Sequence, residues 1–255
     1  MGALIESREL NVAVADRLLV RQLNLRGHAG EFIAILGENG VGKTLTLHCL
    51  AGIRAPVRGS VLLDSRPLAE WPRRIRARRI GLVAQSDEDP FPSKVLEFAL
   101  IGRHPHLGLW DWESAQDVAL ARSALAEVDL RDFDEREVAT LSGGERRRLA
   151  IATILVQQPA VYLLDEPTNH LDPHHAITTL KLFKERAAAG ACVISTLHDA
   201  NQAERFADLT LLLERDGRWT FGPTRNVVTA ESLSRVYRTQ IAELTAAGRR
   251  IFVDA

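Results

Sequence analysis

The sequence has little net charge, few cysteines and no long apolar run, and each shortage excludes a class of protein. Lys and Arg total 32 against 33 Asp and Glu, so we expect no nucleic-acid partner. Cys49 and Cys192 lie within apolar patterns without a C-x-x-C pair, which indicates buried free thiols and a reducing compartment. No apolar run approaches the roughly 18 residues that a membrane-crossing helix needs, so we expect a chain that is soluble or reaches a membrane through a partner.

Residues 31–52 combine an apolar run, a glycine-rich turn and a helical pattern. The run 32–36 predicts a buried strand, and residues 37–44 fit the phosphate-binding pattern G-x-x-x-x-G-K-[ST]. Glycines let the backbone curl around an anion at the start of a helix, where free N–H groups and the helix dipole favour negative charge. The pattern indicates that Lys43 binds phosphates and that the Thr44 hydroxyl binds Mg²⁺. A chance glycine-rich turn is the alternative, and the flanking strand and helix patterns disfavour it.

The order of strand and helix patterns predicts an α/β fold. Strand patterns occupy 59–64, 79–85, 160–164, 191–197 and 209–214, after two strands around a turn at 15–17, while helical patterns occupy 173–189 and 200–207. This alternation implies a mixed, largely parallel sheet with an antiparallel β part at the N-terminus.

The stretch from about 87 to 158 differs, because its patterns are helical. We expect helices at 95–101 and 112–128, the second with one stripe formed by Ala115, Val118, Ala119, Arg122, Leu125 and Ala126. The prediction is one domain, 1–255, with an inserted all-helical subdomain at about 87–158 and a helical and hairpin tail at about 224–255.

Two carboxylates follow the apolar run 161–164. Asp165 and Glu166 would be costly at the end of a buried strand unless a cation or a reaction used them. Beside a phosphate-binding loop, Asp165 is predicted to hold Mg²⁺ and Glu166 to polarise an attacking water. Two solvent-facing acids at a strand end are the alternative.

Residues 141–145 read Leu-Ser-Gly-Gly-Glu, which predicts a helix start capped by Ser142. Capping does not explain Gly143 and Gly144, since each glycine weakens a helix by about 1 kcal/mol relative to alanine. Free N–H groups at a helix start suit a phosphate. The loop at 37–44 already supplies one such site, so these residues leave open whose phosphate the second would bind.

In this order the motifs make the chain resemble the ATP-binding-cassette (ABC) ATPases over residues 3–225. The features similar to those of the family are the Walker A loop at 37–44, the Q-loop glutamine Gln85, the signature at 141–145, Walker B at 161–166, the D-loop at 169–172 and the switch histidine His198.

The resemblance implies a P-loop NTPase core and a homodimer, with each ATP between the loop of one subunit and Ser142, Gly143 and Gly144 of the other. Catalytic roles are implied for Glu166, His198, Gln85 and Lys43, and Mg²⁺ binding for Thr44, Gln85 and Asp165. The remaining implied nucleotide-site residues are Gly37, Asn39, Gly40, Gly42, Leu45 and Asp172, the last communicating across the dimer.

Residues 101–108, 197–203, the D-loop and the ending at 248–253 are similar to those of importers for ferric siderophores, haem and cobalamin. This resemblance implies an ATPase that drives a membrane permease dimer, indirectly served by an extracytoplasmic substrate-binding protein, and lies at the cytoplasmic face of the inner membrane through the permease. The alternative is a soluble ABC ATPase with an assembly role, as in iron–sulfur cluster assembly. An adenylate-type kinase would not need residues 141–145.

Three features stand outside this interpretation. Members of the family place an aromatic residue against adenine, whereas this chain has Val14 near that place and no Phe, Tyr or Trp up to Arg26, so we expect a weaker grip on adenine. The basic run at 73–79 is either a solvated helix face or a contact for acidic lipid or a partner. His104 and His106 straddle a proline without a third ligand nearby, which disfavours a metal site.

Overall fold

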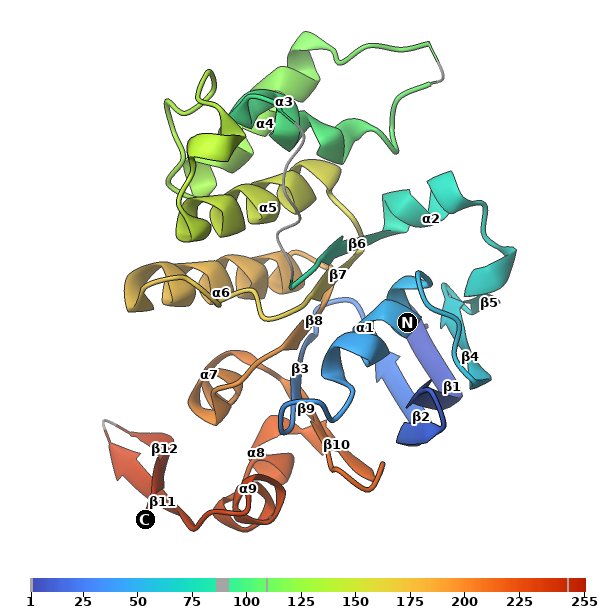
Figure 1. The fold of residues 1–255 in the computed structure, drawn as a ribbon, viewed down its shortest axis with the longest axis vertical. Helices are drawn as coiled ribbons and strands as arrows, with labels where there is room; N and C mark the ends of the chain where they lie inside the picture. The colour runs from blue at the N-terminus through green and yellow to red at the C-terminus, as the bar shows by residue number, and fades with distance from the viewer. Residues whose placement is uncertain (1, 86–91, 109, 247) are drawn as a thin grey trace.

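The computed structural model describes residues 2–85, 92–108, 110–246 and 248–255 (Figure 1). Its largest sheet has the order β10-β9-β3-β8-β7-β6. All neighbours in it pair parallel except β10, which pairs antiparallel with β9 across the turn that contains Gly217. The strands are β3 (Phe32–Leu36), β6 (Ile80–Val83), β7 (Val161–Leu164), β8 (Cys192–Thr196), β9 (Leu209–Leu213) and β10 (Trp219–Pro223).

A second, antiparallel sheet is formed by strands from the first 67 residues, in the order β2-β1-β4-β5. Its strands are β1 (Ile5–Val14), β2 (Arg17–Gly27), β4 (Arg58–Leu63) and β5 (Arg66–Pro67). The mixed, largely parallel sheet and the antiparallel N-terminal part that the sequence predicts are therefore confirmed.

Strand β3 lies at the centre because both of its faces are buried. Phe32, Ala34 and Leu36 pack into the apolar cluster that includes α5 (Gly143–Gln157) and α6 (Pro173–Ala188). Ile33 and Ile35 pack on the other face, with α1 (Lys43–Ala51) and the N-terminal sheet. This alternation is the period of two that a strand imposes. Because β3 lies between β9 and β8, the loop after Leu36 leaves from the middle of the carboxyl end of the parallel strands.

In the part of the chain from Lys94 to Gln157, the described residues form helices joined by turns and irregular segments, and they contain no strand apart from a single bridge between Lys94 and Glu137. Its elements are α3 (Val95–Leu100), η2 (Ile101–Arg103), α4 (Ala115–Glu127), η3 (Val138–Thr140) and α5. These helices lie together beyond the β6 side of the sheet (Figure 1). The first residues of the predicted segment, 87–91, lie outside the described residues.

The prediction for α4 was wrong in its start and in its stripe. Ser114 caps the helix and forms a reciprocal pair with Asp117, so residues 112–114 lie outside it. Ala115, Ala119 and Arg122 are exposed, while Asp117 is buried with Ala121, Ala124 and Leu125. Asp117 faces inward because Arg103 donates to it at 2.7 Å, and its hydrogen bond with the Ser114 hydroxyl is the first of the contacts that lower its pKa to about 2.

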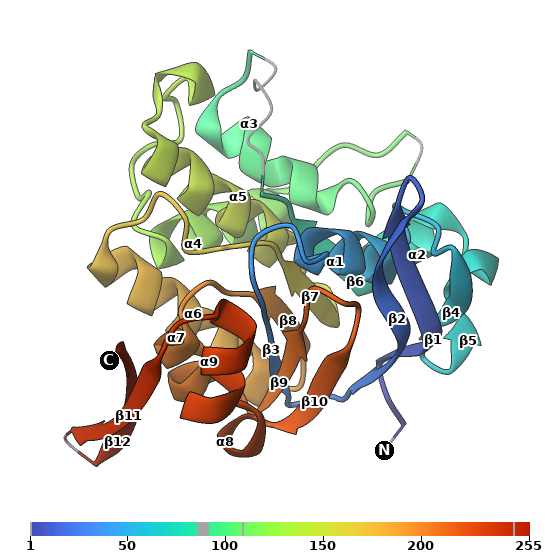
Figure 2. The same ribbon diagram turned by 60° about the horizontal axis from the view of Figure 1, so that its bottom comes forward.

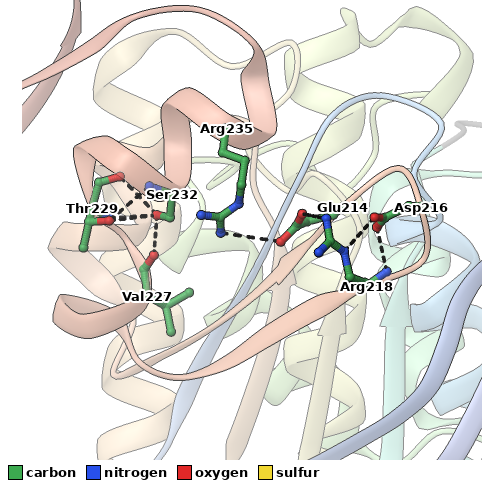
Figure 3. Close-up of polar contacts among 7 residues, drawn as sticks. All are labelled: Glu214, Asp216, Arg218, Val227, Thr229, Ser232 and Arg235. Atoms are coloured by element: carbon green, nitrogen blue, oxygen red, sulfur yellow. Dashed lines mark hydrogen bonds and ion pairs between the residues drawn. The ribbon is translucent and has the colours of Figure 1, made fainter.

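The tail contains α8 (Thr224–Val227), α9 (Ala230–Tyr237) and a hairpin of β11 (Ile241–Ala246) and β12 (Arg249–Asp254), which projects from the body (Figure 2). Thr229 caps α9, and the Ser232 hydroxyl donates to Val227 O at 2.6 Å (Figure 3). Arg235 of α9 reaches Glu214 at 3.5 Å, which joins the tail to the end of β9. The remaining helices are η1 (Leu68–Glu70), α2 (Arg73–Arg79) and α7 (Ala200–Phe206).

Candidate functional site

The glycine-rich loop leaves β3 where only glycine fits. Gly37 has φ +147°, and a Cβ there would lie 2.7 Å from Leu213 O of the neighbouring β9. Gly42 is the N-cap of α1 at φ +111°, and no side chain of the described residues caps this helix. Because its first amides lack a side-chain cap, the start of α1 is suited to bind an anion.

Lys43 is the first residue of α1 and is only 5 % exposed. Its Nζ donates to Gly37 O at 2.8 Å and Glu38 O at 3.1 Å, which folds the side chain back over the loop. Burial lowers the pKa of Lys43, while the charges of Glu166 and Asp165 oppose that shift. The ammonium is thus held between the loop and the two carboxylates that follow β7.

Asp165 and Glu166 are positioned by Thr196, the last residue of β8. The Thr196 hydroxyl donates to Asp165 Oδ1 at 2.7 Å and accepts from the Glu166 amide at 2.7 Å. Glu166 has φ +50°, an uncommon conformation for a residue with a side chain, and this contact helps to maintain it. Thr196 was not among the predicted site residues; its polar side chain at the end of an apolar strand was the available signal.

The Glu166 carboxylate is held by three side chains from different parts of the chain. Gln85 Nε2 donates to Oε2 at 2.8 Å, Asn169 Nδ2 donates to the same oxygen, and His198 Nε2 lies 2.5 Å from Oε1. The structure therefore brings together the predicted catalytic residues Gln85, Glu166 and His198. It adds Asn169, which the sequence placed only in the D-loop.

A cavity of about 440 Å³ opens over this group. Most predicted nucleotide-site residues line it, together with two aliphatic side chains from the N-terminal hairpin; the lining is Val14, Leu19, Asn39, Gly40, Gly42, Lys43, Thr44, Leu45, Gln85, Glu166 and His198. Its volume and its mixture of amides, a lysine and aliphatic walls suit a nucleotide. Ser142, Gly143, Gly144 and Asp172 do not line it.

The residues predicted to hold Mg²⁺ fit that ion. Asp165 Oδ2 is buried and has no hydrogen-bond partner among the described residues, although its other oxygen is bound by Thr196. A buried carboxylate oxygen left in this way is costly unless a ligand completes it. Thr44 and Gln85 add a hydroxyl and an amide oxygen, and all-oxygen donor sets are those that Mg²⁺ prefers.

The N-terminus of α5 is capped by the side chains of Ser142 and Glu145. Ser142 Oγ accepts from the Glu145 amide at 3.3 Å, and Glu145 Oε2 accepts from the Ser142 amide at 2.7 Å. Gly144 lies against the D-loop, where an added Cβ would be 3.1 Å from His170 O. The predicted N-cap is confirmed, and Ser142 and Gly143 are exposed on a surface away from the cavity.

Asp172 is also on the surface and caps α6. Its Oδ1 accepts from the His175 amide at 3.0 Å and its Oδ2 contacts His175 Nδ1 at 2.6 Å. These contacts lower the pKa of Asp172 to about 2, the His175 amide first.

Arg147 connects the Ser142 helix to the backbone around the two carboxylates and was missed by the sequence analysis. It is 2 % exposed, and its guanidinium donates to Ala84 O, Asp165 O and, at 3.4 Å, Pro167 O. Its place on the same buried face of α5 as Ile151 was the sequence signal, because a charge at such a position needs internal partners.

His104 and His106 do not form a metal site in the described residues. No group of three His, Cys, Asp or Glu side chains there could hold a metal, and His106 Nε2 lies 2.9 Å from Gln157 O. Cys49 and Cys192 are buried free thiols, as predicted. Among the described residues, no helix has the length and apolar character required to span a bilayer.

Comparison with protein families agrees with this geometry. The family model described as ABC transporter matches residues 20–169. The chain is 39 % identical over 223 residues to the hemin import ATP-binding protein HmuV of Gloeobacter violaceus, covering 84 % of this chain and 80 % of the relative. It is 34 % identical over 254 residues to the ferric enterobactin transport ATP-binding protein FepC of Escherichia coli K12, covering 98 % and 94 %.

Solved structures give the same match. A metal-chelate type ABC transporter in an inward-facing conformation has a TM-score of 0.85 at 30 % identity, covering 100 % of this chain and 98 % of that one. A dimeric ATP-binding cassette bound to ADP and phosphate has a TM-score of 0.75 at 26 % identity, covering 87 % and 99 %.

Proposed function

The chain belongs to the ATP-binding-cassette family of ABC transporters, and from this premise we propose that it is the ATPase subunit of an importer for an iron chelate, of the hemin or ferric-siderophore kind. The observation that carries the proposal is the extent of the match. The relative named for ferric enterobactin transport aligns with 98 % of this chain, well beyond the motifs shared by ABC ATPases in general.

In this proposal the loop and Lys43 bind the phosphates of ATP. The ammonium exchanges Gly37 O and Glu38 O for phosphate oxygens, and the open start of α1 supplies amide donors. Thr44, Gln85 and Asp165 would hold Mg²⁺, which neutralises charge on the phosphates.

Glu166 is the proposed general base. Its carboxylate accepts a proton from the attacking water once the contacts of Gln85, Asn169 and His198 loosen. His198 and Gln85 then orient the water and the terminal phosphate. Asp165 stays in place through the Thr196 hydroxyl.

The second phosphate-binding group is proposed to come from another copy of the chain. Ser142 and Gly143 are exposed, Gly144 is partly buried, and all three lie outside the cavity of their own chain, which fits a head-to-tail homodimer with ATP between the copies. Asp172, beside this surface, would communicate across the pair. ATP-driven pairing would then move a permease dimer, to which an extracytoplasmic protein delivers the chelate.

A pull-down tests the transport proposal. Glu166→Gln keeps the hydrogen-bonding shape but removes the base, so hydrolysis falls by about 10²–10⁴-fold and an ATP-bound dimer accumulates. Tagged variant recovered from native membranes with ATP is expected to bring a polytopic permease, which would locate the chain at the cytoplasmic face of the membrane. Recovery of soluble partners alone would favour the assembly role instead.

Gel filtration of the same variant tests the composite site. A dimer is expected with ATP and Mg²⁺ and a monomer without them. A monomer under both conditions would contradict the proposed pairing, whatever the pull-down recovers.

A further inference from the structure

Two tryptophans are almost fully exposed in the segment between η2 and α4. Trp110 is 87 % exposed and Trp112 is 88 % exposed, whereas the chain's other tryptophans, Trp71 and Trp219, are partly buried. Aromatic residues form only 5 % of the chain, so such a pair on its surface is a concentrated apolar feature. The nucleotide site does not use either residue.

The segment between η2 and α4 is hydrogen-bonded to the arginine-rich helix α2. Arg74 Nε and Arg78 Nε donate to Pro105 O at 3.0 and 2.6 Å, and Arg78 also reaches His106 O at 3.4 Å. Both ribbon views place the start of the segment beside α2 (Figures 1 and 2). The arginine helix therefore holds the start of the segment that carries the tryptophans.

Helix α2 carries five arginines, no acidic residue and no buried residue. Arg73, Arg74 and Ile75 are exposed. Asp64 pairs with Arg79, while Asp111 and Glu113 add negative charge in the tryptophan segment, so positive charge remains in excess. Asp111 is engaged inside its own turn, where it accepts from the Gly108 amide at 2.7 Å.

We propose that Trp110, Trp112, Arg73, Arg74 and Ile75 form a surface that binds anionic lipid headgroups. Tryptophan prefers the boundary between headgroups and acyl chains, and clustered arginines are attracted to anionic lipid. The proposal rests on the proposed function, because a transport subunit works beside a bilayer. It adds a direct lipid contact to attachment through the permease.

The test uses the purified chain and vesicles, without a permease. Vesicles of phosphatidylcholine with phosphatidylglycerol are expected to shift tryptophan fluorescence to the blue, and brominated acyl chains are expected to quench it. Pure phosphatidylcholine vesicles should bind less, and added salt should weaken binding because it screens the arginines. No shift and no quenching with anionic vesicles would overturn the proposal.

Variants identify the surface. Trp110→Ser with Trp112→Ser should abolish the quenching, whereas Trp71→Phe with Trp219→Phe should retain it. Arg73→Gln with Arg74→Gln should lower vesicle affinity by about fivefold for each arginine. The matched pair Arg131→Gln and Arg225→Gln, exposed in the turn region after α4 and on α8, should leave the affinity unchanged. Equal weakening by both arginine pairs would overturn the assignment.

Two further readouts separate this proposal from the transport proposal. ATP hydrolysis in solution and permease recovery from membranes should be unchanged in Trp110→Ser with Trp112→Ser. The two tryptophan changes could abolish permease recovery while vesicles bind neither the parent chain nor the variant. In that case the surface binds protein rather than lipid, so the lipid proposal fails and the transport proposal stands. If no permease is recovered at all but vesicle quenching persists, the transport proposal fails instead.

Discussion

Two helix N-termini in this chain have glycines at or next to the first turn but differ in their chemistry. Helix α1 begins at Gly42 with no side-chain cap and no acidic residue in its first turn. Helix α5 begins at Ser142 with a complete capping box and Glu145 in its first turn. The first lies at a cavity with a buried lysine, and the second lies on the surface.

In the proposed dimer, the difference separates a phosphate site formed within one chain from a surface that a second copy would bring to the ATP. At α1 the first backbone amides are available to donate to an anion, and the positive charge of Lys43 favours binding of that anion. At α5 the Glu145 amide is already satisfied, and a carboxylate stands beside it. The Ser142 hydroxyl accepts there but keeps its proton to donate, so a phosphate brought by a second copy could still bind.

Removing the α1 cation should have the largest effect. Lys43→Ala deletes a charge aimed at the phosphates and is expected to lower the hydrolysis rate by about 10²–10³-fold, with loss of ATP binding by the monomer. Phosphate release and titration with a fluorescent ATP analogue measure the two effects. Lys181→Ala, on the exposed side of α6, is the control, and a similar loss there would remove the distinction.

Adding an aromatic side chain should strengthen the α1 site without touching α5. Val14 is 47 % exposed and lines the cavity with Leu19, where no Phe, Tyr or Trp is found among the described lining residues. Val14→Tyr is expected to tighten ATP binding by about 1–3 kcal/mol through stacking. Competition between ATP and GTP should show little preference in the parent chain, and a strong preference for ATP there would contradict this account.

Deleting the α5 cap should give a smaller effect of a different kind. Ser142→Ala should lower the free energy of unfolding by about 1 kcal/mol while leaving ATP affinity of the monomer unchanged. Urea denaturation and monomer titration separate the two. Thr229→Ala removes the cap of α9, far from the nucleotide, and should cost similar stability without affecting ATP-dependent pairing. Ser142→Ala should, in contrast, weaken the ATP-dependent pairing of two copies. If that pairing is unaffected, the composite site is contradicted.

The smallest effect should come from the charge at α5. The Ser142 amide, first among its contacts, lowers the pKa of Glu145 below the ordinary 4.5, so this stabilisation is present above pH 4.5 and is lost as pH falls through the lower, folded value. Glu145→Gln should therefore cost about 0.3–1 kcal/mol at pH 7 and less at acid pH. The denaturant midpoints of the parent chain and of Glu145→Gln, at pH 7 and at acid pH, measure this cost. A difference between the two proteins that is the same at both pH values would contradict the electrostatic cause.

The sequence predicted the elements whose signals are local. The strand 32–36 and the Ser142 cap depend on an apolar run and a hydroxyl, and both signals are readable within a few residues. The family motifs then led to Gln85, Glu166 and His198, which the fold does bring together.

Long-range partners account for what the sequence missed. The buried face of α4 differs from the predicted stripe because Asp117 faces inward and pairs with Arg103. No local sequence pattern predicts that contact. Arg147 and Thr196 act through backbone groups and carboxylates from other strands, which become neighbours only when the sheet assembles. Such residues carry no motif, and their roles follow from the packing alone.

The contacts on Glu166 bear on how the protein would behave in the proposed transport role when no substrate is present. An ATPase in that role is surrounded by ATP and must not consume it continuously. Gln85, Asn169 and His198 already occupy the oxygens of this carboxylate, so an attacking water can be positioned on it only when one of those contacts breaks, and hydrolysis without substrate should follow how often that happens. A low resting rate of hydrolysis would then follow from the contacts on Glu166, and the arrival of substrate would raise the rate by breaking them.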